Sequence, residues 1–117
     1  MDDSQRSLRR IGPAELRSLL GEAAGRANVL LVDVREPHEY AAGHLPGAIS
    51  LPMSQLDRRL AELPTEGTTV FICRSGGRSL RAAGQALRAG FESPVNLEGG
   101  LMAWAAQIDP TLVVADP

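Results

Sequence analysis

The sequence contains one cysteine, Cys73, among 117 residues, and this scarcity excludes two common ways of stabilising a small chain. A single thiol cannot form an internal disulfide bond, and Cys73 with His38 and His44 does not supply the ligands of a structural zinc site. We therefore expect a protein of a reducing compartment with no structural metal. A chain of this length buries roughly two thirds of its unfolded surface, enough for one domain with one core.

The sequence also lacks an excess of charge of either sign, aromatic side chains and long apolar segments. Twelve basic and fourteen acidic residues leave a formal net charge of −2, and aromatic residues make up 3% of the chain. Without a basic tract, nucleic acid is not an expected partner. The longest aliphatic run, 29–32, is too short to cross a bilayer, and the first residues lack the basic-then-apolar order of a secretion signal. We expect a soluble, cytoplasmic protein without a membrane partner.

Segments with strand and helix periodicity alternate along the chain between two polar ends. Residues 1–10 are predicted to form a flexible arm, and residues 109–117 a C-terminal tail. Strands are predicted at 29–34, 48–51, 68–72 and 95–97. Helices are predicted from Pro13, at 35–44 as a short turn, from a cap at Ser54, from Gly77 or Arg78 to about Ala89, and from 99–100. This alternation predicts an α/β fold with a central parallel sheet.

Cys73 ends one predicted strand, and a loop rich in glycine and arginine follows it. Ligands of parallel sheets bind beyond the carboxyl ends of the strands, where Cys73 and Asp33 both fall. The amides of residues 74–79 lack sheet or helix partners, and the glycines allow them to converge on one anion. The following helix adds about half a positive charge at its N-terminus, which lowers a thiol pKa. We therefore expect Cys73 to be a thiolate near neutral pH, and thus a nucleophile.

The same loop could bind an oxyanion of sulfur or of phosphorus, and its spacing favours sulfur. Cysteine-dependent phosphatases are similar in having a cysteine and an arginine with five residues between them, whereas four separate Cys73 from Arg78. Ser79 occupies the position that would need arginine. Because the shorter loop makes a tighter ring, a phosphate monoester is expected to fit poorly for in-line attack. A phosphatase or an arsenate reductase is the less favoured alternative.

Four segments in order carry a resemblance to a known family. They are 32–36 (VDVRE), 43–48 (GHLPGA), 73–79 (CRSGGRS) and 98–100 (EGG), the last followed by Ala103 and Trp104. The sequence thereby resembles a single-domain rhodanese, a sulfurtransferase of the rhodanese homology family. The resemblance implies a rhodanese-like α/β domain over residues 11–108, with a central parallel five-stranded sheet flanked by helices on both faces.

The resemblance also implies a chemistry and a set of site residues. Cys73 is expected to take a sulfane sulfur from a donor such as thiosulfate, to carry it as a persulfide and to pass it to cyanide or a thiol, without a metal or other cofactor. The amides of residues 74–78 are expected to cradle the persulfide, and Arg74 to attract an anionic donor. The predicted persulfide-binding loop consists of Arg74, Ser75, Gly76, Gly77, Arg78 and Ser79, with Asp33 and Arg35 as supporting residues.

Several nearby side chains have simpler structural explanations. A carboxylate at the end of a buried strand commonly binds loop amides or an arginine, so Asp33 is expected to pair with Arg35 or a loop arginine. His44 lies in a turn, and a sulfur ionised by its amide cradle needs no histidine base. Trp104 is assigned to the core or a pocket rim, and Glu98 to a hydrogen-bonding brace.

Two functional alternatives stay open from the sequence. The rhodanese fold also serves non-catalytic binding or regulatory modules, although these commonly lack the cysteine that is present here. The sulfur acceptor is either a small molecule or a protein in a sulfur relay. The sequence does not distinguish these acceptors, because the rim of the open loop is set by tertiary structure.

Overall fold

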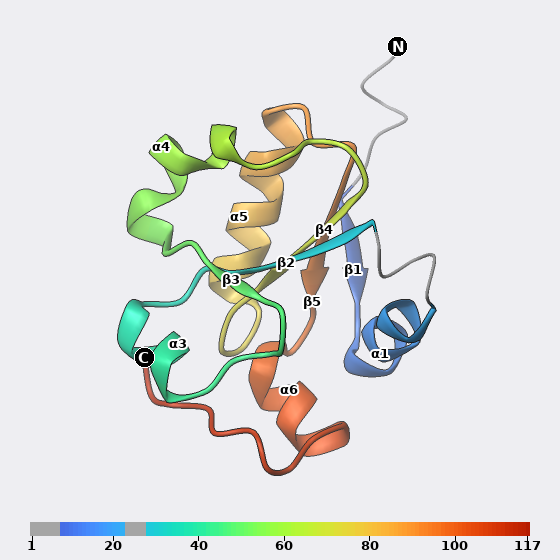
Figure 1. Cartoon of the computed structure of the whole chain (residues 1–117), viewed down its shortest axis with the longest axis vertical. Coiled ribbons are helices and arrows are strands. Elements are labelled where there is room, and N and C mark those ends of the chain that lie inside the picture. The colour runs from blue at the N-terminus through green and yellow to red at the C-terminus, as the bar shows by residue number, and fades with distance from the viewer. Residues whose placement is uncertain (1–7, 23–27) are drawn as a thin grey trace.

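Five parallel strands form the centre of the molecule in a computed structural model that describes residues 8–22 and 28–117 (Figure 1). The strands lie in the order β1-β5-β4-β2-β3, and every neighbouring pair is parallel. Their bounds are β1 Arg9–Ile11, β2 Val29–Asp33, β3 Ile49–Ser50, β4 Thr68–Ile72 and β5 Ser93–Leu97. The predicted α/β fold with a five-stranded parallel sheet is therefore confirmed.

Helices cover both faces of this sheet, as the resemblance implied (Figure 1). Their bounds are α1 Pro13–Gly21, α3 Pro37–Ala42, α4 Leu56–Arg59, α5 Gly77–Arg88 and α6 Gly100–Gln107, with the 3₁₀ turns η2 Met53–Gln55 and η3 Leu60–Glu62 flanking α4. Side chains of a strand alternate between faces. Val70 and Ile72 accordingly pack in the core cluster of α1 and α6, whereas Phe71 packs with α4 and α5. Within the described ranges, none of the helices is long and apolar enough to cross a membrane.

The register of β2 and β4 brings the two strands that carry predicted site residues together at their carboxyl ends. Asp33 pairs with Ile72, and the Val34 N–H donates to the Ile72 carbonyl at 2.9 Å. Val34 and Cys73, the next residues along the two strands, therefore leave the sheet at the same edge, and Arg35 follows Val34. The loop from Cys73 into α5 lies at this edge, where a parallel α/β sheet places its ligands.

Two residues of the predicted N-terminal arm belong to the sheet. Arg9 and Arg10 lie in β1, where they pair in register with Val95 and Asn96 of β5. The strand is at the edge of the sheet, and only Ile11 of its three residues is buried, so the sequence offers no apolar periodicity there. Residues 1–7 of the predicted arm lie outside the described residues.

The predicted helix cap at Ser54 is wrong. Ser54 lies inside η2, and α4 begins at Leu56 without a side-chain hydrogen bond at its N-terminus. The chain enters α4 through a 3₁₀ turn in which the Gln55 N–H donates to the Pro52 carbonyl at 2.8 Å. Backbone bonds of the turn thus replace the expected contact from a serine hydroxyl.

Candidate active site

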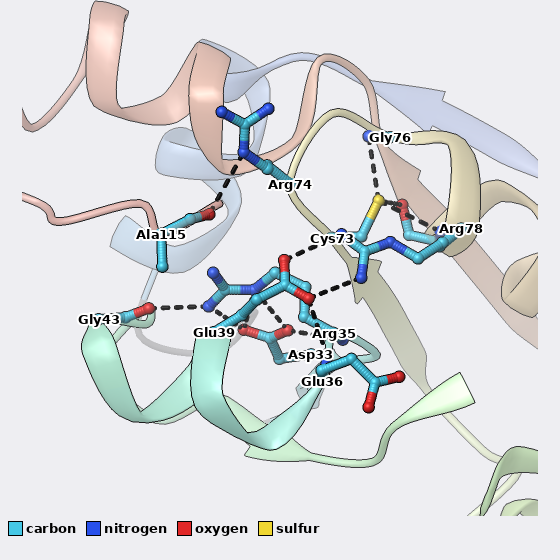
Figure 2. A network of polar contacts seen from close by, with 11 residues as sticks. Asp33, Arg35, Glu36, Glu39, Gly43, Cys73, Arg74, Gly76, Arg78 and Ala115 are labelled. Atoms are coloured by element: carbon cyan, nitrogen blue, oxygen red, sulfur yellow. Dashed lines mark hydrogen bonds and ion pairs between the residues drawn. The ribbon is translucent and has the colours of Figure 1, made fainter. Parts of the chain in front are cut away.

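Residues 73–76 link β4 to α5, and together with the first turn of α5 they surround the sulfur of Cys73 with hydrogen-bond donors (Figure 2). Gly76 has a φ of 105°, a left-handed conformation that turns the chain into α5 and suits glycine. The Sγ atom accepts hydrogen bonds from the Gly76 N–H at 3.1 Å, the Ser79 N–H at 3.4 Å and the Ser79 hydroxyl at 3.3 Å. Cys73 itself is buried, whereas Ser75 and Gly77 are exposed. The loop therefore forms a cradle for an anionic sulfur.

These donors determine the ionisation of the thiol. Burial raises the pKa of Cys73. The Ser79 hydroxyl and the amides of Ser79, Gly76 and Ser75 together lower this pKa by more than burial raises it. The net result is a Cys73 pKa below the ordinary value of a thiol. Hydrogen bonding to the charged form is thus the main cause of the ionisation, against the opposing effect of burial.

Backbone N–H groups at the N-terminus of α6 donate hydrogen bonds to carbonyl groups of the loop. The Leu101 N–H donates to the Cys73 carbonyl at 2.9 Å, and the Met102 N–H donates to the Arg74 carbonyl at 3.0 Å. Gly100 has a φ of 58°, and a Cβ at this position would lie 2.5 Å from both of these carbonyl oxygens. The close approach of α6 to the loop therefore requires glycine at position 100.

The variant Gly100→Ala is expected to lower the free energy of unfolding by about 2–4 kcal/mol and to raise the pKa of Cys73. The left-handed backbone and the overlap with two carbonyl groups both contribute, and the displaced loop weakens its amide bonds to sulfur. Urea unfolding and the pH dependence of Cys73 alkylation measure the two effects. Gly21→Ala, where a Cβ meets no atom within 4 Å, is the matched control. Equal stability of the two variants would contradict this account of Gly100.

Arg78 does not donate to the sulfur but is bound by Glu39 of α3 (Figure 2). Its two terminal nitrogens donate to the Glu39 carboxylate at 2.7 and 3.0 Å, and Glu39 is fully buried. Burial raises the pKa of Glu39, but the Arg78 hydrogen bond, the Glu36 N–H, and the charges of Arg78 and Arg35 bring it below its ordinary value. Glu39 raises the pKa of Arg78 in return. The pair fastens the start of α5 to α3.

Sequence reasoning did not identify Glu39. The only signal was local: Glu39 follows Glu36 by three residues, with Pro37 between them, which is the spacing of a capping box at a helix start. The structure shows both bonds of that box, including the Glu36 N–H to Glu39 Oε1 at 3.0 Å. The pairing with Arg78, 39 positions away, depends on the fold.

Asp33 and Arg35 form a fully buried ion pair at the end of β2. Arg35 donates through Nε to Asp33 Oδ1 at 2.9 Å and through Nη2 to Oδ2 at 2.8 Å, while its backbone N–H donates to Oδ1 at 3.1 Å. The same Nη2 donates to the Gly43 carbonyl at 2.7 Å. The partner of Asp33 is therefore Arg35 rather than a loop arginine, and the pair ties the end of β2 to the end of α3.

Arg74 is directed to the C-terminal tail (Figure 2). Its Nε donates to the Ala115 carbonyl at 3.3 Å, and its Nη2 lies 3.4 Å from the Asp116 carboxylate. The tail is itself anchored, because Leu112 and Val114 pack on the core cluster of α1 and α6. For Arg74 to attract an anionic donor, its side chain has to exchange these contacts for the donor.

Asn96 of β5 connects the loop to a network that sequence reasoning also missed. Its Oδ1 lies 2.5 Å from the Ser79 hydroxyl, and its Nδ2 donates to the Gly76 carbonyl at 3.2 Å and to the Glu98 carboxylate. Glu98 also accepts a bond from Arg10 at 3.2 Å, so its interpretation as a hydrogen-bonding brace agrees with the geometry. A polar residue inside an otherwise apolar segment was the one signal for Asn96.

His44 and Trp104 have structural contacts. His44 Nδ1 lies 2.8 Å from the Tyr40 carbonyl, and the two rings stack with centroids 3.7 Å apart. Trp104 belongs to the core cluster of α1 and α6. The three hydrogen bonds to the Cys73 sulfur described above come from Gly76 and Ser79 rather than from His44 or Trp104.

Together these features define a class: an α/β domain whose buried cysteine ends a central parallel strand, with its sulfur bound by the loop that starts the next helix. Comparison with known proteins gives this class a family. Residues 13–107 match the family of rhodanese-like domains, and the chain therefore belongs to that family.

Individual relatives agree with this assignment. A protein of Allochromatium vinosum named sulfurtransferase is 39% identical over 95 residues, which are 81% of this chain and 89% of that protein. The probable adenylyltransferase/sulfurtransferase MoeZ of Mycobacterium tuberculosis is 41% identical over 89% of this chain, which spans only 26% of MoeZ. The crystal structure of a rhodanese-like domain protein from Staphylococcus aureus superimposes with a TM-score of 0.76 at 30% identity, covering 92% of this chain and 99% of that one.

Proposed function

We propose that this protein is a sulfurtransferase in which Cys73 takes a sulfane sulfur from a donor such as thiosulfate, carries it as a persulfide and passes it to cyanide or a thiol. The observation that carries the proposal is the set of three hydrogen bonds from Gly76 and Ser79 to the Cys73 sulfur. They stabilise an anionic sulfur in place of a histidine base. The relative named sulfurtransferase, of which this chain spans 89%, supports the same function.

In the proposed loading step, the Cys73 thiolate attacks the outer sulfur of thiosulfate. The sulfur–sulfur bond of thiosulfate breaks, sulfite leaves with its electron pair, and the negative charge moves to the terminal sulfur of the new persulfide. The backbone amides of residues 74–78 are the donors proposed to stabilise that charge. In the second step the acceptor attacks the terminal sulfur, the Sγ–S bond breaks, and the Cys73 thiolate is restored.

The geometry gives less support to phosphate chemistry. A phosphatase needs an arginine that binds the phosphate oxygens, because a planar guanidinium matches them with two hydrogen bonds. Both terminal nitrogens of Arg78 instead donate to Glu39, and the Ser79 hydroxyl donates to the sulfur. We expect no turnover of an aryl phosphate that depends on Cys73.

A protein thiol is a second candidate for the acceptor. The relative MoeZ carries a combined adenylyltransferase and sulfurtransferase name, so a domain like this one also occurs within a longer protein. The chemistry at Cys73 is the same for a small thiol and a protein thiol, because both attack the terminal sulfur of the persulfide. Comparing the rates of loading from thiosulfate, a mercaptopyruvate-type donor and a protein persulfide identifies the preferred donor.

Loading by thiosulfate is expected to accelerate with rising pH, with the midpoint of this increase below the ordinary thiol pKa of about 8.5. The sign follows from the lowered pKa of Cys73: the thiolate is the reactive form, it is lost as the pH falls through that pKa, and it is fully present above it. Stopped reactions analysed by mass give the rate at each pH. A short cysteine peptide is the control with an ordinary pKa.

Two outcomes would contradict the proposal. The first is a pH dependence of the loading rate whose midpoint for Cys73 is equal to or above that of the control peptide. The second comes from steady-state kinetics with thiosulfate and cyanide, where a persulfide intermediate predicts the parallel lines of a ping-pong mechanism. Intersecting lines would mean that both substrates bind before sulfur moves.

A further inference from the structure

The Ser79 hydroxyl has one proton and two acceptors. Its oxygen lies 3.3 Å from Cys73 Sγ and 2.5 Å from Asn96 Oδ1. A serine hydroxyl donates only one hydrogen bond, so it serves one acceptor at a time. All three side chains are buried, at 1% exposure or less, and solvent is therefore a poor substitute for the acceptor left without a donor.

The orientation of Asn96 is fixed by its other contacts. The Gly76 carbonyl and the Glu98 carboxylate, which both lie at Nδ2, are acceptors, so the amide nitrogen must face them. The oxygen of the side-chain amide consequently faces Ser79 as an acceptor. The backbone of Asn96 is held in β5 by its register with Arg10 of β1 and Phe71 of β4. Asn96 Oδ1 thus has a fixed position and competes with Cys73 Sγ for the one hydrogen bond that the Ser79 hydroxyl donates.

We propose that Asn96 is a positioning residue for sulfur transfer: its Oδ1 accepts the hydrogen bond of the Ser79 hydroxyl when Cys73 is a thiol or a persulfide, and the hydroxyl donates to Sγ instead when Cys73 is a thiolate. In the thiol state the S–H donates to the Ser79 oxygen while the Ser79 hydroxyl donates to Asn96 Oδ1. In the thiolate state the hydroxyl turns to Sγ, and Asn96 Oδ1 loses its donor. Asn96 therefore raises the free energy of the thiolate relative to the other two states.

The persulfide part of this inference rests on the proposed function. When the thiolate attacks thiosulfate and sulfite leaves, Sγ becomes neutral and the charge resides on the terminal sulfur, so the Ser79 hydroxyl returns to Asn96. When the acceptor attacks the terminal sulfur, Sγ departs with the electron pair of the broken bond, and the hydroxyl turns back to stabilise it. In both half-reactions the Ser79 hydroxyl thus donates to Sγ when Sγ carries negative charge, and to Asn96 Oδ1 when Sγ is neutral.

The charged groups around the sulfur form ion pairs to which neither Asn96 nor Ser79 belongs. One member of these pairs, Glu98, also accepts a hydrogen bond from Asn96. The groups are Arg74 with Asp116, Arg78 with Glu39, Arg35 with Asp33, and Arg10 with Glu98. A neutral substitution at position 96 leaves each of these pairs in place. A change in the Cys73 pKa on such a substitution is then assigned to the Ser79 hydroxyl.

Two variants of Asn96 separate the effect of its acceptor, Oδ1, on the Cys73 pKa from the effect of its donor, Nδ2. Asn96→Val and Asn96→Asp both remove the amide donor to the Gly76 carbonyl and to the Glu98 carboxylate. The Gly76 carbonyl keeps its bond from the Leu80 N–H at 3.2 Å, and Glu98 keeps its bond from Arg10 at 3.2 Å. Only the valine variant removes the acceptor that competes for Ser79. We expect Asn96→Val to lower the Cys73 pKa by about one unit, because a hydroxyl committed to a thiolate stabilises it by that order. Asn96→Asp retains an acceptor and adds negative charge, and is expected to raise the pKa.

The measurement is the pH dependence of iodoacetamide alkylation of Cys73 in protein not exposed to a sulfur donor. A purely structural role would loosen the loop in both Asn96 variants and raise the pKa in both, so that result would overturn the proposal. Asn96→Ala provides the same test as the valine variant if valine does not pack.

A Ser79→Ala background completes the test. Ser79→Ala is expected to raise the Cys73 pKa by about one unit, and Ser79→Thr, which keeps the hydroxyl, to restore it. In the alanine background Asn96→Val is expected to leave the pKa unchanged, and a persisting decrease would contradict the proposal. Since these titrations need no sulfur donor, their failure leaves the proposed sulfur transfer standing, and a failure of persulfide formation leaves the titrations interpretable.

Discussion

Replacement of Arg35 by methionine is expected to lower the free energy of unfolding by about 3–5 kcal/mol, the usual effect of removing one partner of a buried ion pair. Asp33 and Arg35 are both fully buried and share a bidentate contact. Methionine fills much of the volume but leaves the Asp33 carboxylate with only the backbone N–H of residue 35. It also leaves the Gly43 carbonyl without its bond from Arg35.

The double variant Asp33→Leu, Arg35→Met is the matched control for this prediction. Because it removes both charges, it is expected to be clearly more stable than Arg35→Met alone. Urea unfolding of the wild type, both single variants and the double variant gives the coupling free energy. A loss below about 1 kcal/mol in Arg35→Met, the scale of an exposed pair, would contradict the assigned role of the buried pair.

The variant Cys73→Ser is expected to reduce sulfur transfer from thiosulfate to cyanide by several orders of magnitude. A serine hydroxyl is far less acidic than a thiol, and the donors around this position stabilise an anion that serine does not form at neutral pH. Formation of thiocyanate measures the activity. Because the substitution is nearly isosteric and the Gly76 and Ser79 donors retain an acceptor, unfolding in urea is expected to change little. Activity within tenfold of the wild type would contradict a nucleophilic role for Cys73.

The sheet and the position of Cys73 could be predicted because they depend on local pattern. The apolar segments at 29–34 and 68–72 are the buried central strands β2 and β4, and their bounds differ from the prediction by at most one residue. Parallel strands bring their carboxyl ends to one edge, so the adjacency of Asp33 and the Cys73 loop follows from the strand assignment.

The residues that the sequence did not reveal act through long-range contacts. Glu39 and Asn96 reach the loop from α3 and β5. The local signals that they carry, a capping-box spacing and a polar residue in an apolar segment, do not indicate a contact with the loop. The strand β1 was missed for a related reason: it has three residues, and the sheet edge leaves Arg9 and Arg10 exposed. Its pairing with β5 depends on the register of the assembled sheet.

Arg74 illustrates how the tertiary structure changes the interpretation of a motif. As part of the sequence CRSGGRS it is predicted to attract an anionic donor, whereas the structure places it against Ala115 and Asp116. The tail could not be positioned from the sequence, because Leu112 and Val114 are suited either to packing on the domain or to a partner. Their packing on the core brings the tail to the loop.

The most direct test of the account is the intact mass of the protein after incubation with thiosulfate and removal of the donor. We expect the wild type to gain the mass of one sulfur atom, to lose it on addition of cyanide with formation of thiocyanate, and Cys73→Ser to gain none. The absence of this gain across thiosulfate, a mercaptopyruvate-type donor and a protein persulfide would contradict the proposal that Cys73 carries sulfur.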